Sequence, residues 1–106
     1  MSEKKIFTLF RLYKAPSYKK TKKWFVVVPT KTGRRRTVYF GARGYMDYTQ
    51  HHDKLRRYRY RLRHQRDKIH DPTKSGFWAW RVLWGPSTNI QINLKKAITH
   101  AKKMLK

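Results

Sequence analysis

The chain has 106 residues and no cysteine, so it is long enough for one small domain and excludes disulfides and thiolate metal sites. Lys and Arg number 28 against five Asp and Glu, which gives a formal net charge of +23. Such a charge opposes compaction by self-repulsion and favours an anionic partner. A basic surface kept only for solubility is the plainer alternative, although added acid serves solubility better.

No segment is apolar enough to cross a membrane, because a membrane-spanning helix needs about eighteen or more apolar residues in a row. The first apolar run is short and is interrupted by Arg11, so it does not resemble a secretory signal. We therefore expect a single soluble domain over residues 1–106 that is not secreted by that route.

Three β-strands are predicted in the first 40 residues. β-branched and aromatic side chains dominate residues 5–13, on both sides of the strand, and a second, more apolar strand covers residues 23–29. A basic loop at 14–22 separates the two. A turn at 30–33, with its glycine in the left-handed conformation, leads into a third strand at 34–40. These short connections predict a three-stranded antiparallel meander.

Two glycines interrupt the strand pattern after the third strand. Gly41 and Gly44 indicate positive φ angles or a close approach of the backbone to another group. With Arg43 between them, they could bind a phosphate through backbone N–H groups, but the motif is weak. Residues 45–52 are ambiguous between a helical turn and an ordered loop.

The basic run at 53–68, DKLRRYRYRLRHQRDK, predicts a helix, and Asp53 can cap its first turn. The apolar side chains of this region recur at helical spacing and form one narrow stripe. The members of the stripe are Leu55, Tyr58, Leu62 and Ile69. We expect the stripe to face the core, which would leave Arg57, Tyr60 and Arg61 pointing to solvent.

Two further helices are predicted near the C-terminus. The segment GFWAWRVLW at 76–84 reads as a short buried helix, with its tryptophans in the core rather than forming a platform for base stacking. Thr73 or Ser75 can cap it. From Ser87 or Thr88 onward, apolar residues repeat with the helical period and indicate a last helix with a lysine-rich outer face. The expected class is α+β, a meander followed by two or three helices packed on it.

The sequence offers little for catalysis. Four of the five acidic residues lie at 47–71 among Arg and Lys, so ion pairing or capping explains them better than acid–base chemistry. His51-His52-Asp53 looks like a metal-binding trio, but adjacent side chains point apart. There is no Walker loop, no dinucleotide-binding glycine pattern and no nucleophile elbow. We expect no catalytic residue, no metal site and no cofactor.

Basic clusters carry the functional prediction, because the planar guanidinium of arginine makes paired hydrogen bonds to phosphate. We expect these clusters to form one contiguous face that contacts nucleic acid. Tyr60 is included because it could stack on an unpaired base, although packing against a neighbouring element is the alternative. The candidate residues are Lys19, Lys20, Lys22, Lys23, Arg34, Arg35, Arg36, Arg43, Arg56, Arg57, Arg59, Tyr60, Arg61, Arg63 and Arg66.

The motifs FGARGY at 40–45 and GFWxxxxLW at 76–84 resemble a family of small, uncharacterised proteins of nucleocytoplasmic large DNA viruses, the giant viruses. The likeness covers residues 36–88 and is weakest at the arginine run 34–36 and in the basic last helix. That family has no settled activity, so no residue role follows from it. The resemblance implies a context, the particle of a virus with a large double-stranded DNA genome.

We therefore expect a non-enzymatic, sequence-tolerant DNA-binding protein that helps condense or organise a viral genome. We expect it to be located in the virion and, during infection, in the host cytoplasm or nucleus. A structural minor virion protein that meets an acidic capsid surface is the second hypothesis, and an RNA- or ribosome-associated protein is the third. An enzyme is the weakest. The residues alone leave open DNA or RNA, one strand or two, and the oligomeric state.

Overall fold

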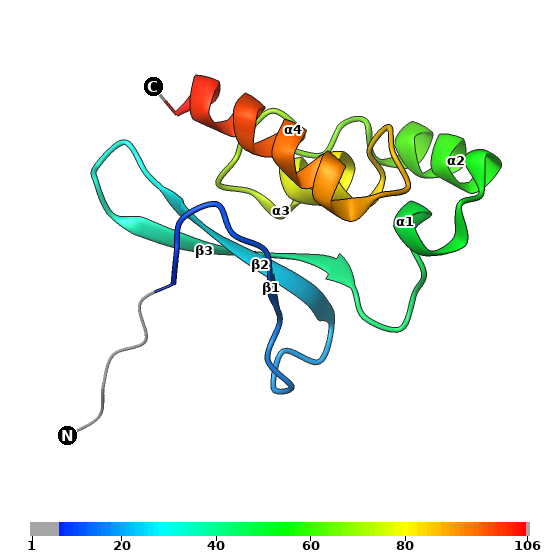
Figure 1. Cartoon of the computed structure of the whole chain (residues 1–106), viewed down its shortest axis with the longest axis horizontal. Coiled ribbons are helices and arrows are strands. Elements are labelled where there is room, and N and C mark those ends of the chain that lie inside the picture. Colours follow the sequence, from blue (N-terminus) through cyan, green and yellow to red (C-terminus); the bar gives the residue numbers. More distant parts are fainter. Residues whose placement is uncertain (1–6, 106) are drawn as a thin grey trace.

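The helices lie together on one side of a three-stranded antiparallel sheet (Figure 1). The computed structural model describes residues 7–105. The strands are β1 (Tyr13–Lys14), β2 (Lys22–Pro29) and β3 (Arg35–Ala42), in the spatial order β1-β2-β3. The helices are α1 (Tyr48–His51), α2 (Lys54–His64), α3 (Ser75–Trp78), the π-helical turn η1 (Ala79–Leu83) and α4 (Ile90–Met104). The predicted α+β class, with its antiparallel meander, is confirmed.

Strand β2 is covered on both faces, which explains why its sequence is continuously apolar rather than alternating. On the helix side, Val26 is fully buried and pairs with Val38 of β3. On the other side, Phe25 is only 5% exposed, because the rings of Phe7 and Tyr13 each lie 5.1 Å from its ring. The sheet therefore has its main core beneath the helices and a small aromatic cluster on its opposite face.

The prediction of a first strand over residues 5–13 is wrong for most of its length. Residues 5 and 6 lie outside the described residues, and only Tyr13–Lys14 pairs as β1. Phe10 has a φ of 61°, which breaks the extended path, although its N–H still donates to Val27 O at 2.9 Å. The turn has a packing reason, since Phe10 joins the core under the helices while Phe7 covers the other sheet face.

The positive φ angles expected at the glycines are confirmed. Gly33 in the hairpin has φ 83°, and Gly41 at the end of β3 has the same value. A Cβ atom at Gly41 would lie 2.8 Å from Leu83 Cδ1 and 3.2 Å from Lys23 Cβ, so this position also allows a close approach of η1 to the sheet.

The apolar segment after residue 75 forms the centre of the core, as predicted, but of its tryptophans only Trp78 is buried, whereas Trp80 and Trp84 are partly exposed. Phe77, Trp78, Val82 and Leu83 are at most 1% exposed. Trp78 also satisfies its indole N–H, which donates to Pro72 O at 2.8 Å. The helix begins at Ser75 without a side-chain cap and widens into the η1 turn, a change of pitch that the sequence pattern did not indicate.

Helix α4 closes the core with a clean apolar stripe, in which Leu94 and Ala101 are buried. It begins two or three residues later than predicted, because Asn89 supplies the cap and its side chain accepts from Gln91 N and Ile92 N. Within residues 7–105, no helix combines the length and apolar character that a bilayer span would require.

We expect Trp78→Ala to destabilise the fold by about 3–5 kcal/mol or to leave the chain unfolded, because it empties a fully buried aromatic site. Urea unfolding measures this. The matched control is Ile92→Ala on α4, where the side chain is 46% exposed and the cost should stay within about 0.5 kcal/mol. Equal costs for the two substitutions would contradict the assignment of Trp78 to the core.

Candidate nucleic-acid interface

Helix α2 faces the opposite way from the prediction. The apolar stripe points to solvent, with Leu55 55%, Tyr58 60% and Leu62 50% exposed. The helix contains no fully buried residue. Its existence and its cap are confirmed, since Asp53 accepts from Leu55 N and Arg56 N, but it ends at His64 rather than at residue 68. The inward side is therefore polar and basic.

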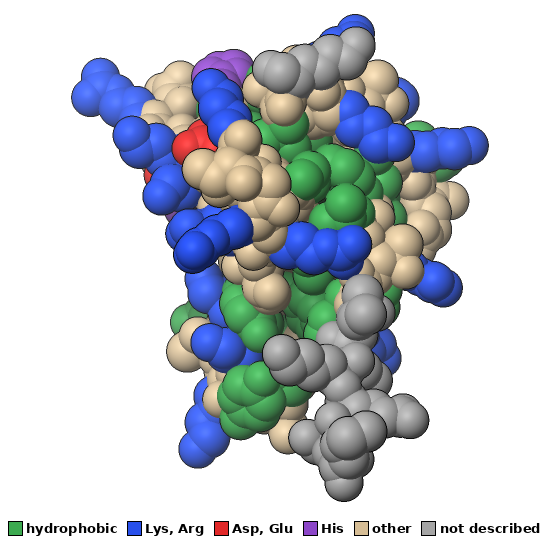
Figure 2. Space-filling view, turned by 90° about the vertical axis from the view of Figure 1, so that its left-hand side faces the viewer, with side chains coloured by type: hydrophobic (Ala, Val, Ile, Leu, Met, Phe, Trp, Pro, Cys, Tyr) green, Lys and Arg blue, Asp and Glu red, His purple; other side chains and the backbone are tan. Residues whose placement is uncertain are grey.

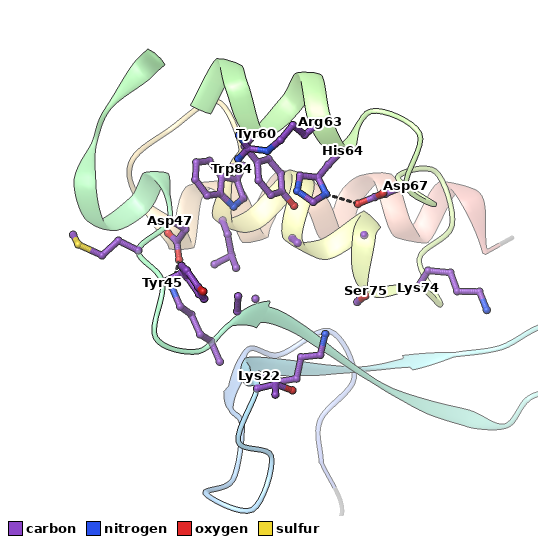
Figure 3. Close-up of a pocket in the computed structure, with 18 of the residues that line it drawn as sticks. Lys22, Tyr45, Asp47, Tyr60, Arg63, His64, Asp67, Lys74, Ser75 and Trp84 are labelled. Atoms are coloured by element: carbon purple, nitrogen blue, oxygen red, sulfur yellow. Dashed lines mark hydrogen bonds and ion pairs between the residues drawn. The ribbon is translucent and has the colours of Figure 1, made fainter. Parts of the chain in front are cut away.

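An aromatic stack holds the inward side of α2. The Tyr60 ring lies 4.2 Å from the Trp84 ring with only 4° between their planes, and the His64 ring lies 4.2 Å from Tyr60. Figure 3 shows the three rings in a row, with Tyr60 in the middle. Burial raises the pKa of Tyr60 to about 12, because the enclosed phenol resists ionisation, and the nearby Asp67 adds to this effect. The expected outward position of Tyr60 is wrong.

Two arginines expected at the surface also turn inward. Arg57 Nε donates to Trp84 O at 3.1 Å and to Gly85 O at 2.8 Å. Arg61 Nη1 donates to Trp84 O at 2.9 Å, and its guanidinium lies 3.9 Å from the centre of the Trp80 ring. These carbonyls follow the last turn of η1, where a helix has no internal donors left and its dipole favours a cation. The outward orientation predicted for both arginines is therefore wrong.

A groove lies between α2 and the sheet, with a volume of about 820 Å³. Figure 3 shows Tyr60, His64 and Trp84 along one side, with Lys22 extending from the sheet on the other. The lining is strongly basic, because the exposed arginines of α2 and its continuation meet lysines from β2 and from the loop before α3. The basic lining residues are Lys22, Lys23, Arg56, Arg59, Arg63, Arg66, Lys68 and Lys74.

Both acidic residues in the groove are already engaged. Asp47 is 4% exposed, accepts from Lys23 Nζ at 3.0 Å and caps α1. Asp67 lies 2.8 Å from His64 Nδ1. The prediction that the acids serve ion pairing or capping is confirmed for Asp47 and Asp53, whereas Asp67 contacts a histidine side chain. Outside the groove, Asp71 accepts from Thr73, and this hydrogen bonding lowers its pKa.

The His51-His52-Asp53 trio makes local contacts instead of gathering around one point. His51 Nδ1 accepts from Asp53 N at 2.9 Å, and its ring lies 5.4 Å from that of Trp84. Burial lowers the pKa of His51, and the nearby Arg56 lowers it further. Over residues 7–105, no three His, Asp or Glu side chains come together as a metal site would require.

The single basic face expected from the sequence does not form. Residues 34–36 lie on the hairpin, at the opposite end of the long axis from α2 (Figure 1). Figure 2 looks at the hairpin end and shows Lys and Arg side chains spread over it, with hydrophobic side chains between them. Arg43 binds the first loop, donating to Lys22 O at 2.9 Å and Ala15 O at 3.1 Å.

In that loop, Lys20 is exposed, whereas Lys19 Nζ lies 4.6 Å from the centre of the Tyr39 ring. The structure thus brings Lys22 and Lys23 together with the exposed arginines of α2. It also adds Lys68 and Lys74, which the sequence analysis missed. Their basic character was visible in the sequence, but their position depends on how the chain after α2 folds back.

The sequence comparisons give one match. The profile of a family of unknown function, DUF5754, matches residues 12–64, half of the chain. The matched segment contains all three strands, α1 and α2, and so most of the residues that line the groove, whereas Trp84, Lys68 and Lys74 lie beyond it. Neither a curated protein nor a solved structure matches the chain.

The inward arginines should be needed for stability even when the charge is kept. We expect the double substitution Arg57→Lys and Arg61→Lys to cost about 1–3 kcal/mol, because a lysine lacks the fork that reaches these carbonyls. The matched control is Arg59→Lys with Arg63→Lys, on the exposed side of the same helix, which should stay within about 0.5 kcal/mol. Urea unfolding compares the two, and equal losses would refute the anchoring role.

Stability should also depend on Tyr60 at alkaline pH. The phenol has a pKa of about 12 in the folded chain against 10.0 ordinarily, so its contribution is complete below pH 10 and is lost as the pH rises toward about 12. Tyr60→Phe keeps the ring and removes this part of the loss. Tyr58→Phe, at an exposed position, should behave like the wild type. Unfolding free energies measured across this pH range test the claim, and three identical pH profiles would contradict it.

Proposed function

We propose that this chain, which belongs to the family of unknown function DUF5754, is a non-enzymatic protein that binds the phosphate backbone of nucleic acid in the groove beside α2. One observation carries the proposal. Exposed arginines, Arg56, Arg59 and Arg63, line one side of a helix whose other side is anchored, and they face lysines across the groove. Because both acids in the groove are engaged, a strong positive charge is left for a ligand.

The spacing of the arginines suits a phosphate backbone. Arg56 and Arg63 are separated by about 10 Å along the helix axis at 1.5 Å per residue. That length corresponds to about three phosphates at the axial spacing of one strand of a duplex. The aromatic stack and the inward arginines hold α2 in one orientation, so the exposed arginines extend from a helix that is oriented toward the groove before any ligand arrives.

Contacts of this kind make the binding tolerant of sequence, since phosphates carry no base identity. Both faces of the Tyr60 ring are occupied by Trp84 and His64, so stacking of a base on Tyr60 is not part of the proposal. The aromatic side chain available in the groove is Tyr45, which is 74% exposed and could stack on an unpaired base.

The ligand that we propose is DNA, because the motifs at 40–45 and 76–84 resemble those of small proteins of large DNA viruses. In that setting the protein would help condense or organise the genome in the particle. The formal charge of +23 supports such a role, because neutralising phosphates releases counterions and drives binding without base recognition.

The groove can be tested with two matched double variants that remove the same charge. Arg59→Gln with Arg63→Gln changes the groove, and Arg34→Gln with Arg36→Gln changes the exposed hairpin. Affinities for two duplexes of unrelated sequence are measured between about 50 and about 200 mM salt. We expect the groove variant to weaken both duplexes alike and to flatten the log–log salt slope by about two units, with a smaller effect for the hairpin variant.

Equal losses for the two variants would mean that diffuse charge, and not the groove, binds the ligand. Binding confined to one of the two duplexes would contradict the sequence-tolerant proposal. Competition with single-stranded DNA and single-stranded RNA then identifies the preferred form. If unpaired bases contribute, Tyr45→Ala should weaken the single strands by about 1–3 kcal/mol and leave the duplexes unchanged.

A further inference from the structure

Helix α2 has a third surface, which neither the core nor the groove uses. We call it the outer stripe; it consists of Leu55, Tyr58 and Leu62, each at least half exposed. Their spacing of three and four residues places them on one side of the helix. Two large aliphatic side chains and a tyrosine are therefore presented to solvent over two helical turns.

An apolar stripe on another helix of the same chain is buried. On α4, Leu94 and Ala97 occupy the equivalent spacing and are at most 7% exposed. The outer stripe cannot be buried in the same way, because the carbonyls of Trp84 and Gly85 hold the arginine side of α2 inward. That constraint explains the orientation of α2. The constraint does not explain why the exposed side of α2 carries leucines and a tyrosine instead of polar residues. An exposed apolar patch on an ordered helix is typical of an interaction site.

We propose that the outer stripe docks an acidic amphipathic helix of another protein, with apolar side chains against the stripe and carboxylates along its borders. Charge complementarity identifies this partner. By helical spacing, Lys54 borders the stripe on one side and Arg59 on the other, and both are exposed. An apolar ridge with acidic flanks matches this pattern in shape and in sign.

The same pattern disfavours the other occupants. A second copy of the chain would bring Lys54 and Arg59 against their own kind, on molecules that each carry a charge of +23. A bilayer surface needs a larger apolar area than three side chains spanning about 10 Å. The phosphate backbone of a nucleic acid offers nothing apolar to cover the leucines. An acidic amphipathic helix of another protein offers both an apolar face for the leucines and negative charge for Lys54 and Arg59.

The test uses a synthetic acidic helix of about 18 residues, with leucines along one face and glutamates beside them. A second peptide of the same composition has its leucines distributed around the helix. The variant Leu55→Gln with Leu62→Gln removes the stripe and keeps good helix formers. The matched control, Ile92→Gln with Met104→Gln, changes two exposed apolar positions on α4. Kd values come from fluorescence anisotropy, and urea unfolding checks each variant.

The wild type and the α4 control should bind the amphipathic peptide at least about tenfold more tightly than the redistributed one, because leucine burial adds to charge attraction. The stripe variant should lose this preference while keeping its stability and its affinity for duplex DNA. Equal binding of both peptides to every variant would leave only charge attraction and overturn the proposal, as would unfolding of the stripe variant. Self-association, or binding to phosphatidylserine-containing vesicles, that disappears in the stripe variant would also overturn it in favour of those occupants.

Discussion

Two backbone carbonyls just beyond η1 determine how the surface of this protein is arranged. The carbonyls of Trp84 and Gly85 lie past the last helical turn, and Arg57 and Arg61 supply their donors. With the Tyr60 ring stacked on Trp84, these contacts hold α2 by its polar side. The exposed arginines then face the groove and the outer stripe faces solvent, so one anchoring set defines both surfaces.

The sequence was sufficient to predict those elements whose buried side is determined by the pattern of apolar residues. The hairpin of β2 and β3, the buried segment after Ser75 and the stripe of α4 were all predicted, because burying valines and leucines dominates there. The existence of α2 was predicted correctly, but the side of the helix that faces the core was not. Arg57, Tyr60, Arg61 and His64 also recur at helical spacing, and it is their side that faces inward. The carbonyls that select this side lie more than twenty residues later, beyond the reach of local periodicity.

The candidate site was predicted in its residue types and only partly in its arrangement. The arginines at 34–36 and those of α2 belong to the same basic composition. However, β3 is about 25 Å long at 3.3 Å per residue and begins at the hairpin end, which lies opposite α2. Lys22 and Lys23 join the groove because β2 begins at the end of the sheet nearest α2. The closely spaced positive charges of α2 repel one another, and an anionic ligand in the groove would reduce this repulsion.

The orientation of α2 is the central claim, and a nuclear Overhauser spectrum of protein with labelled leucine methyl groups tests it most directly. We expect cross-peaks between the Tyr60 and Trp84 rings, whose centres lie 4.2 Å apart, and none from the methyl groups of Leu55 or Leu62 to Trp84. Strong cross-peaks from either leucine to the Trp84 indole, without any from Tyr60, would contradict it.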